Sequence, residues 1–141
     1  MRILLTGVTG LLGRAMARQL IAAGHAVTGI ATYPHQNLHP DVDFVCASLG
    51  DPVLEQLAGA SDVVLHLAPI ETGVPGSAGI NGLVHVAHAA ARAGARLIFV
   101  SVSAGQPALY RQAETLVSGG WAPSLVVRTC NTSKNSSSAL G

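Results

Sequence analysis

The sequence predicts an α/β protein, a doubly wound parallel sheet of about six strands with helices on both faces. Short aliphatic runs alternate with segments of helical apolar spacing along the whole 141-residue chain. The first aliphatic run ends in a glycine-rich turn, TGVTGLLG at 6–13. In addition, 49% of the residues are hydrophobic and only 11% are charged, which is typical of strands buried on both faces.

The order of the elements follows from local patterns. RILLT at 2–6 is expected to be the first strand, and the helix over 11–23 that follows it should stop at Gly24. Asp51-Pro52 has the N-cap and first-turn proline pattern of a new helix, and Gly94 should close a long alanine-rich one. The other expected strands are 26–30, 43–46, 62–67, 96–101 and 124–128, and the other helices are 51–58, 80–93 and 108–118.

These elements predict one domain over 1–131 and a flexible Ser-rich tail over 132–141. If the strands have the order 3-2-1-4-5-6, Cys46 lies on one edge strand and Cys130 just beyond the other, which excludes a disulfide between them. We interpret both cysteines as small core residues.

Composition argues against two classes of partner. The net charge is +1 without a run of Lys or Arg, so no broad basic surface for nucleic acid is expected. The apolar runs are strand-sized, far shorter than the roughly 20 residues that cross a bilayer. With no signal-peptide pattern at the first residues, we expect no membrane partner and a cytoplasmic location.

Each glycine of the first turn has a mechanical reason to be there. Gly7 permits a sharp exit from the strand, Gly10 removes a Cβ that would keep the backbone away from a pyrophosphate, and Gly13 lets the helix pack closely on the sheet. The helix that begins near Gly10 offers unpaired N–H groups and its positive dipole end to phosphates. The turn therefore predicts a bound dinucleotide.

The spacing TGxxGxxG resembles that of the NAD-dependent epimerase/dehydratase family, an extended or atypical branch of the short-chain dehydrogenase/reductase superfamily. HLAP at 66–69, Asn81-Gly82, RLIFVSVS at 96–103 and VVRTCN at 126–131 also resemble segments of that family. The resemblance covers the chain up to about Asn131 and implies a Rossmann fold with NAD or NADP as the cofactor.

The first glycine turn and the ends of the later strands are the places where this resemblance implies cofactor contacts. Position 31 or 32 usually carries an acidic residue for NAD or a basic one for NADP, and neither is present, so the choice between the two stays open. Ala47-Ser48-Leu49 replaces the family's Gly-Asp-Leu, which weakens an adenine contact. The expected cofactor-binding residues are Gly7, Thr9, Gly10, Leu11, Leu12, Gly13, Ala31, Thr32, Ser48, Leu49, Leu67, Ala68, Pro69 and Ser101.

The family's catalytic pair, a Tyr with a Lys four residues later on one helix face, has no counterpart here. The single lysine, Lys134, lies in the tail, and the tyrosines are Tyr33 and Tyr110. One alignment puts Gln106 and Tyr110 at the pair's positions; the other keeps Tyr110 as the Tyr and puts Glu114 at the Lys position. We therefore assign no catalytic residue, and we interpret Ser103 as a strand-end hydrogen-bonding serine.

The histidines suggest two further candidate sites, a metal site and a catalytic triad. His85 and His88 are three apart on a helix, but without a nearby acid we interpret them as surface residues and expect no metal. His66 is interpreted as buried and hydrogen-bonded. A triad of Ser103, His66 and Asp62 is excluded, since four residues along a strand separate the His and Asp by about 13 Å.

Three functions stay open at this point. The first is an NAD(P)-binding domain that is not competent for the redox step by itself, as part of a larger polypeptide, with a partner protein, or as a degenerate member. The second is an active oxidoreductase or sugar-nucleotide epimerase whose acid/base groups come from elsewhere. The third is a structural remnant that binds no cofactor.

Overall fold

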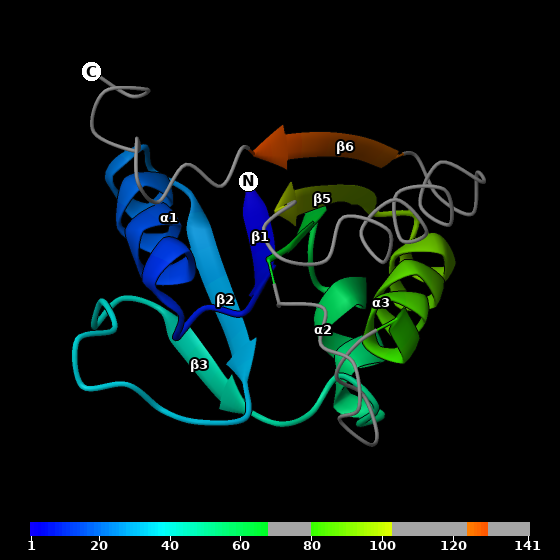
Figure 1. The fold of residues 1–141 in the computed structure, drawn as a ribbon, viewed down its shortest axis with the longest axis horizontal. Coiled ribbons are helices and arrows are strands. Elements are labelled where there is room, and N and C mark those ends of the chain that lie inside the picture. Colours follow the sequence, from blue (N-terminus) through cyan, green and yellow to red (C-terminus); the bar gives the residue numbers. More distant parts are fainter. Residues whose placement is uncertain (68–79, 103–123, 130–141) are drawn as a thin grey trace.

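A computed structural model describes residues 1–67, 80–102 and 124–129, and for 80–81, 101–102 and 124–129 the backbone alone. Six parallel strands form one sheet in the order β3-β2-β1-β4-β5-β6, as predicted (Figure 1). The strands are β1 (Arg2–Thr6), β2 (Ala26–Ala31), β3 (Asp43–Cys46), β4 (Val63–His66), β5 (Arg96–Val102) and β6 (Ser124–Thr129), and the helices are α1 (Leu11–Ala22), α2 (Val53–Gly59) and α3 (Ile80–Ala93).

The predicted boundaries hold to within one or two residues. Both glycines expected to stop helices have left-handed backbone, with φ of 92° at Gly24 and 68° at Gly94. The helix predicted to begin at Asp51 begins instead at Val53, whose N–H donates to Asp51 Oδ1 at 2.9 Å. The helix predicted over 108–118 lies outside the described residues.

Strand β4 is shorter at both ends than the predicted 62–67. Before it, the Asp62 carboxylate accepts the backbone N–H of Arg2 at 2.8 Å, and this bond lowers the pKa of Asp62. After it, the N–H of Leu67 donates to a side chain of β1. Both ends of β4 are therefore tied to β1 through side chains.

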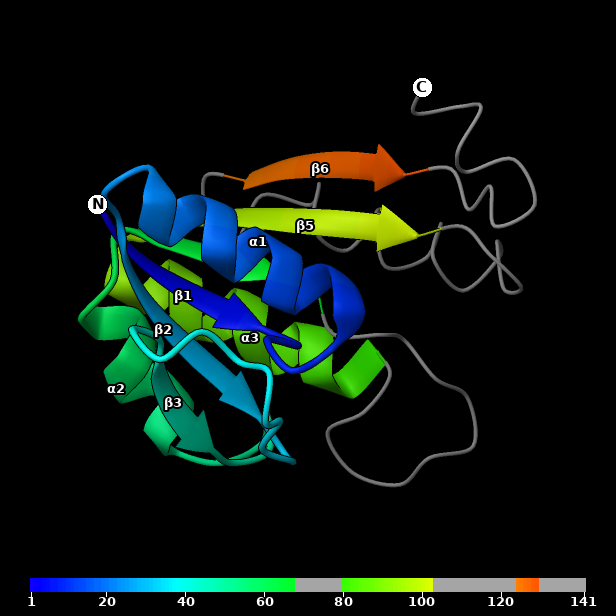
Figure 2. The same cartoon turned by 90° about the vertical axis from the view of Figure 1, so that its left-hand side faces the viewer.

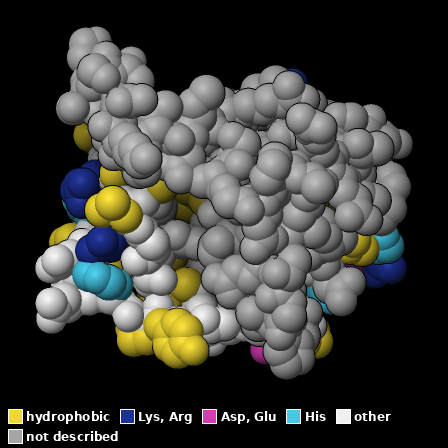
Figure 3. All heavy atoms as spheres, in the orientation of Figure 1, with side chains coloured by type: hydrophobic (Ala, Val, Ile, Leu, Met, Phe, Trp, Pro, Cys, Tyr) yellow, Lys and Arg dark blue, Asp and Glu magenta, His cyan; other side chains and the backbone are white. Residues whose placement is uncertain are grey.

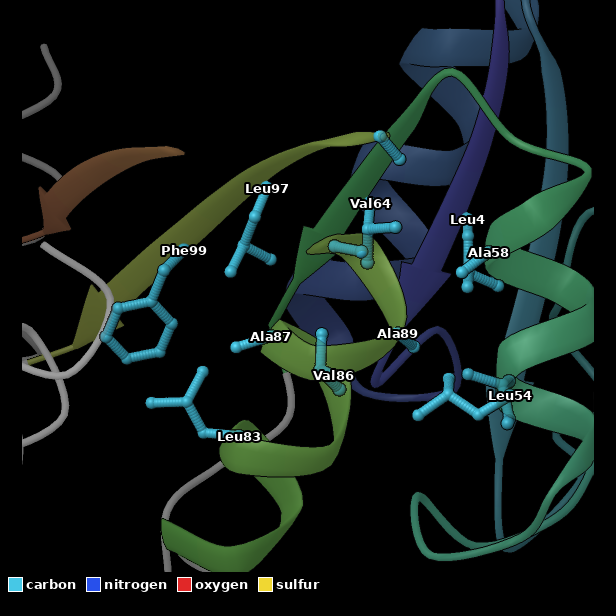
Figure 4. Close-up of a cluster of buried hydrophobic side chains, with 13 residues drawn as sticks. Leu4, Leu54, Ala58, Val64, Leu83, Val86, Ala87, Ala89, Leu97 and Phe99 are labelled. Carbon is cyan, nitrogen blue, oxygen red and sulfur yellow. The ribbon is translucent and has the colours of Figure 1, made fainter. Parts of the chain in front are cut away.

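Alternating side chains of the strands build two cores, one on each face of the sheet. Ile3 and Leu5 of β1 pack in the core under α1, whereas Leu4, between them, packs in the core under α2 and α3. Figure 4 shows Leu54 and Ala58 of α2 and residues of α3 directed toward the strands. The helices thus cover both faces, and the strand ends remain as the places where functional residues gather.

The carboxyl ends of the parallel strands lie at one edge of the sheet, and most of the arrowheads point to one side in Figure 2. The chain leaves β1 there and runs to β2 on one side, while β4 lies on the other side of β1. This reversal of strand order is where open α/β sheets bind their ligands. The glycine turn after β1 lies at this point.

The interpretation of Cys46 as a core residue is wrong. Cys46 is exposed at the end of β3, and its Sγ donates to the carbonyl oxygen of Thr32 at 3.3 Å. The reason is that β3 is an edge strand whose last residue lies beyond both cores. Cys130 lies outside the described residues.

Gly29 in β2 packs directly against the Val8 side chain. A Cβ at Gly29 would lie 2.6 to 2.8 Å from three side-chain atoms of the fully buried Val8. We expect Gly29→Ala to lower the free energy of unfolding by about 1–3 kcal/mol, because this site has no room for a methyl group. Denaturant unfolding followed by circular dichroism measures the loss.

Gly59 provides the matched control, since a Cβ there would meet nothing within 4 Å. Gly59→Ala should leave stability unchanged or raise it by a few tenths of a kcal/mol, up to about 1. Equal effects of the two substitutions would contradict the steric explanation.

Candidate functional site

The turn between β1 and α1 is closed by backbone contacts that only glycine allows. Gly7 has a φ of 66°, and its carbonyl oxygen accepts the N–H of Gly10 at 3.1 Å. A Cβ at Gly13 would lie 2.1 Å from that same oxygen and 2.8 Å from the Cα of Val8. Gly13 therefore lets α1 pack against the turn itself, rather than against the sheet as the sequence suggested.

The N-terminus of α1 is open. Gly10, the N-cap residue, is exposed, and within the described part of the chain no side chain caps the helix. The first turn carries no acidic residue, and Leu11 and Leu12 are exposed. Free amide N–H groups at the positive end of a helix dipole favour an anion such as a phosphate.

A Cβ at Gly10 would come no closer than 3.4 Å to any neighbouring atom, which is an ordinary contact. The fold therefore has room for a Cβ at Gly10 but not at Gly13. This difference is what the expected roles require, since Gly10 is meant to admit a ligand and Gly13 to admit the chain's own backbone.

The carboxyl ends of β2 and β3 lie at the same edge of the sheet as the glycine turn. Ala31 is half-buried and its carbonyl oxygen accepts the N–H of Ala47 at 3.0 Å, while Thr32 is exposed. Ser48 is exposed, and Leu49 packs partly against the core under α2 and α3. Of these residues, Thr32 and Ser48 carry exposed polar side chains.

A buried polar cluster joins the ends of β1 and β4. Thr6 Oγ1 accepts the N–H of Leu67 at 3.0 Å and lies 2.8 Å from Nδ1 of His66, and both side chains are almost fully buried. The His66 ring stacks on Phe99 of β5, with 5.7 Å between centroids. The expectation of a buried, hydrogen-bonded His66 is confirmed.

Desolvation by this burial lowers the pKa of His66 to about 4, so the ring is neutral at pH 7. A neutral ring in this position orients the Leu67 backbone through Thr6. Asp62 accepts a hydrogen bond from Arg2, whereas His66 is bonded to Thr6. Asp62 therefore does not orient His66, which agrees with the exclusion of a triad from the sequence.

The other expected positions are described by their backbone alone or lie outside the described residues. Ser101 lies in β5 opposite Arg128 of β6, with only its backbone described. Ala68 and Pro69 lie outside the described residues, as do Ser103, Gln106, Tyr110, Glu114 and Lys134.

His85 and His88 are both exposed on α3. Across residues 1–67, 80–102 and 124–129, no group of three His, Cys, Asp or Glu side chains is placed to hold a metal ion.

Sequence reasoning missed three residues that shape this site, namely Thr6, Arg14 and Gly29. Thr6 is a polar residue at the end of an aliphatic strand, and Gly29 interrupts another, so both left a signal in the sequence. Arg14 gave none, because its contact with His35 joins α1 to the loop after β2.

A comparison with protein families identifies the chain. The model of the NAD dependent epimerase/dehydratase family matches residues 3–124. The chain belongs to this family. The Rossmann fold that the resemblance implied is confirmed by the strand order and by solved structures.

Curated proteins of two mycobacteria, both named as uncharacterized proteins, are similar to this chain in sequence. The protein Rv2047c of Mycobacterium tuberculosis is 34% identical over 108 residues, which is 76% of this chain and 12% of the relative. The protein Mb2073c of Mycobacterium bovis matches equally. The chain thus spans about an eighth of the curated relatives it matches.

Solved structures of low identity share the fold. The Bordetella bronchiseptica enzyme WbmH in complex with NAD+ has a TM-score of 0.77 at 21% identity, over 92% of this chain and 56% of that one. WbmG with NAD, from the same organism, has a TM-score of 0.74 at 23% identity, over 91% and 52%. An Agrobacterium tumefaciens short-chain dehydrogenase/reductase superfamily protein with bound NAD has a TM-score of 0.70 at 22% identity, over 91% and 48%.

No helix in the described parts of the chain has the length and apolar character needed to cross a membrane.

The buried His66 generates a prediction about pH. Its pKa is 6.5 in a solvated state and about 4 in the fold, so below pH 6.5 the unfolded chain binds a proton that the folded chain does not. Above pH 6.5 the ring is neutral in both states and its burial does not reduce the stability of the fold. As the pH falls from 6.5 toward 4, protonation of the unfolded chain increasingly favours unfolding. We expect the free energy of unfolding to fall by about 1.4 kcal/mol per pH unit in this window.

His66→Gln removes the titrating ring but keeps a polar side chain beside Thr6. Its free energy of unfolding should lack this slope between pH 6.5 and 4, whereas His85→Gln, on the exposed face of α3, should keep it. Urea titrations at half-unit pH steps measure both slopes. A His66→Gln slope equal to that of the unsubstituted protein would exclude a proton-free buried His66.

Proposed function

We propose that this chain is an NAD(P)-binding Rossmann unit of an epimerase/dehydratase-type protein and does not perform the redox step by itself. The observation that carries the proposal is the open N-terminus of α1 behind a glycine turn, at the edge where the strand order reverses. The family assignment supports it, as do the NAD complexes of proteins with the same fold.

In this proposal the pyrophosphate lies on the amides of Leu11 and Leu12 and against the backbone of Gly10, whose own N–H is bonded to Gly7, while Gly7, Thr9 and Gly13 shape the turn. The adenosine ribose lies near Ala31 and Thr32, because Ala31 ends the strand next to β1 and Thr32 follows it. The remaining expected contacts are Ser48 and Leu49 toward the adenine, and Leu67, Ala68, Pro69 and Ser101 along the cofactor.

The bound cofactor would supply hydride transfer, and the chain's own residues would hold and orient it. Thr6 has a positioning role: its hydroxyl fixes the direction of the Leu67 amide beside the cofactor's expected path. A Tyr with a Lys four residues later is absent from the sequence, so the proton transfer of the family's reaction has no donor of that kind.

The unit therefore acts with groups from outside it, in a larger polypeptide or with a partner protein, or it senses the dinucleotide. The share of about an eighth of its curated relatives supports the first of these. A cytoplasmic location remains part of the proposal. The runner-up function is an active oxidoreductase or epimerase whose acid/base groups are supplied from elsewhere.

Calorimetric titration of the 141-residue chain with NAD, NADH, NADP and NADPH tests the proposal. We expect at least one of the four to bind with a dissociation constant below about 1 mM, that is, with about 4 kcal/mol or more. Absence of binding by a folded sample up to millimolar concentration would refute the function and favour a structural remnant.

Gly10→Val separates binding from folding. Its Cβ meets only an ordinary contact within the protein but fills the place expected for the pyrophosphate, so affinity should fall at least about tenfold while the unfolding midpoint changes little. Gly59→Ala, in α2, is the matched control and should bind as the unsubstituted chain does. A Gly10→Val protein of unchanged affinity would contradict the assigned pyrophosphate position.

Turnover gives a separate prediction. With saturating dinucleotide and a panel of hydroxy and sugar-nucleotide substrates, we expect no hydride transfer by this chain alone, because the required Tyr and Lys pair is missing. The near-ultraviolet absorbance of the reduced nicotinamide measures hydride transfer. Steady turnover, abolished by Gly10→Val, would favour the runner-up function.

A further inference from the structure

Two basic side chains meet where α1 lies against the loop that follows β2. Arg14, in the first turns of α1, donates through Nε to the carbonyl oxygen of Gly10 at 3.3 Å. Its Nη1 lies 3.1 Å from both ring nitrogens of His35, which belongs to the loop between β2 and β3. The guanidinium is thus held between the glycine turn and this loop.

The hydrogen bonds of His35 make this contact unusual. Its Nδ1 already accepts the backbone N–H of Asn37 at 3.0 Å, which assigns the proton of the neutral ring to Nε2. Arg14 Nη1 is equally far from the two ring nitrogens, so it lies over the face of the ring and not in line with Nε2–H. A guanidinium has donors only, so an anionic oxygen at the edge of this pair would accept from both residues.

No acidic group offsets these donors in the described part of the chain. The ion pairs found there join Arg2 to Asp62 and Arg92 to Glu55, and neither includes Arg14. Residues 1–40, which span β1, α1, β2 and the start of the following loop, contain no Asp or Glu. Figure 3 shows Arg and His side chains adjacent on this side of the molecule, with no acidic side chain between them.

We propose that Arg14 and His35 bind the 2′-phosphate of NADP(H), and that the chain therefore selects the phosphorylated dinucleotide. The inference rests on the proposed function, which places the adenosine ribose at the end of β2. An acidic residue there would hold the ribose 2′-hydroxyl of NAD, whereas a nearby Arg accommodates a 2′-phosphate. Ala31 and Thr32 supply no carboxylate, and Arg14 supplies the planar, fixed donors that phosphate prefers.

Calorimetry on the 141-residue chain tests the selection with NADPH and NADH. NADPH should bind at least about tenfold more tightly. Adenosine 2′,5′-bisphosphate should exceed 5′-AMP by a similar factor, and inorganic phosphate should compete with neither at the same concentration. These three small ligands distinguish a nucleotide 2′-phosphate from any free anion.

Substitutions assign the selection to named residues. Arg14→Gln should lower NADPH affinity about tenfold and leave NADH affinity within about twofold. Arg18→Gln, exposed one turn later on α1, is the matched control and should change neither. Thr32→Asp places a carboxylate at the end of β2 and should reverse the preference, which tests the site without altering α1.

Each contrary result has a defined meaning. Equal affinity for NADPH and NADH, equal losses for both in Arg14→Gln, or competition by inorganic phosphate as strong as by the bisphosphate would overturn this inference and leave the proposed function standing. Absence of all dinucleotide binding by the folded chain would overturn the proposed function, and this inference with it.

Discussion

Close packing around Val8 is the constraint on which the site depends. The fully buried Val8 side chain lies where Gly29 of β2 lacks a Cβ, and its backbone lies where Gly13 of α1 lacks one. Because Gly13 and Gly29 lack a Cβ, the turn after β1 can contact both β2 and α1 closely. The direction in which the N-terminus of α1 points is fixed by this contact, and the proposed pyrophosphate site lies at that N-terminus.

The junction of β1 and β4 depends on a polar contact instead. Thr6 and His66 pair directly across the two strands, and their side chains bond inside an otherwise apolar core. In a low dielectric such a bond is strong, and leaving either group unpartnered is costly. The contact therefore specifies how the strand ends meet, and it holds the Leu67 amide in place where the strand order reverses.

The sequence predicted the strand order and nearly every boundary because strands, caps and stop glycines leave local patterns. It could not predict features that depend on which strands become edges or which loops meet. Cys46 looked like a core residue because it ends an apolar run, but β3 lies at the edge of the sheet. The contact of Arg14 with His35 joins residues 21 apart through a loop that has no periodic pattern.

In the proposed function, recognition and chemistry depend on different parts of the chain for a physical reason. The glycine turn, the end of β2 and the Thr6 contact all lie within residues 2–67 and act through backbone, shape and one guanidinium. Proton transfer instead needs a matched pair of side chains at fixed helical spacing, which a few substitutions remove. Those substitutions leave the packing around Val8 untouched. The proposal that this chain binds a dinucleotide without such a pair is therefore physically consistent, because the two functions depend on different residues.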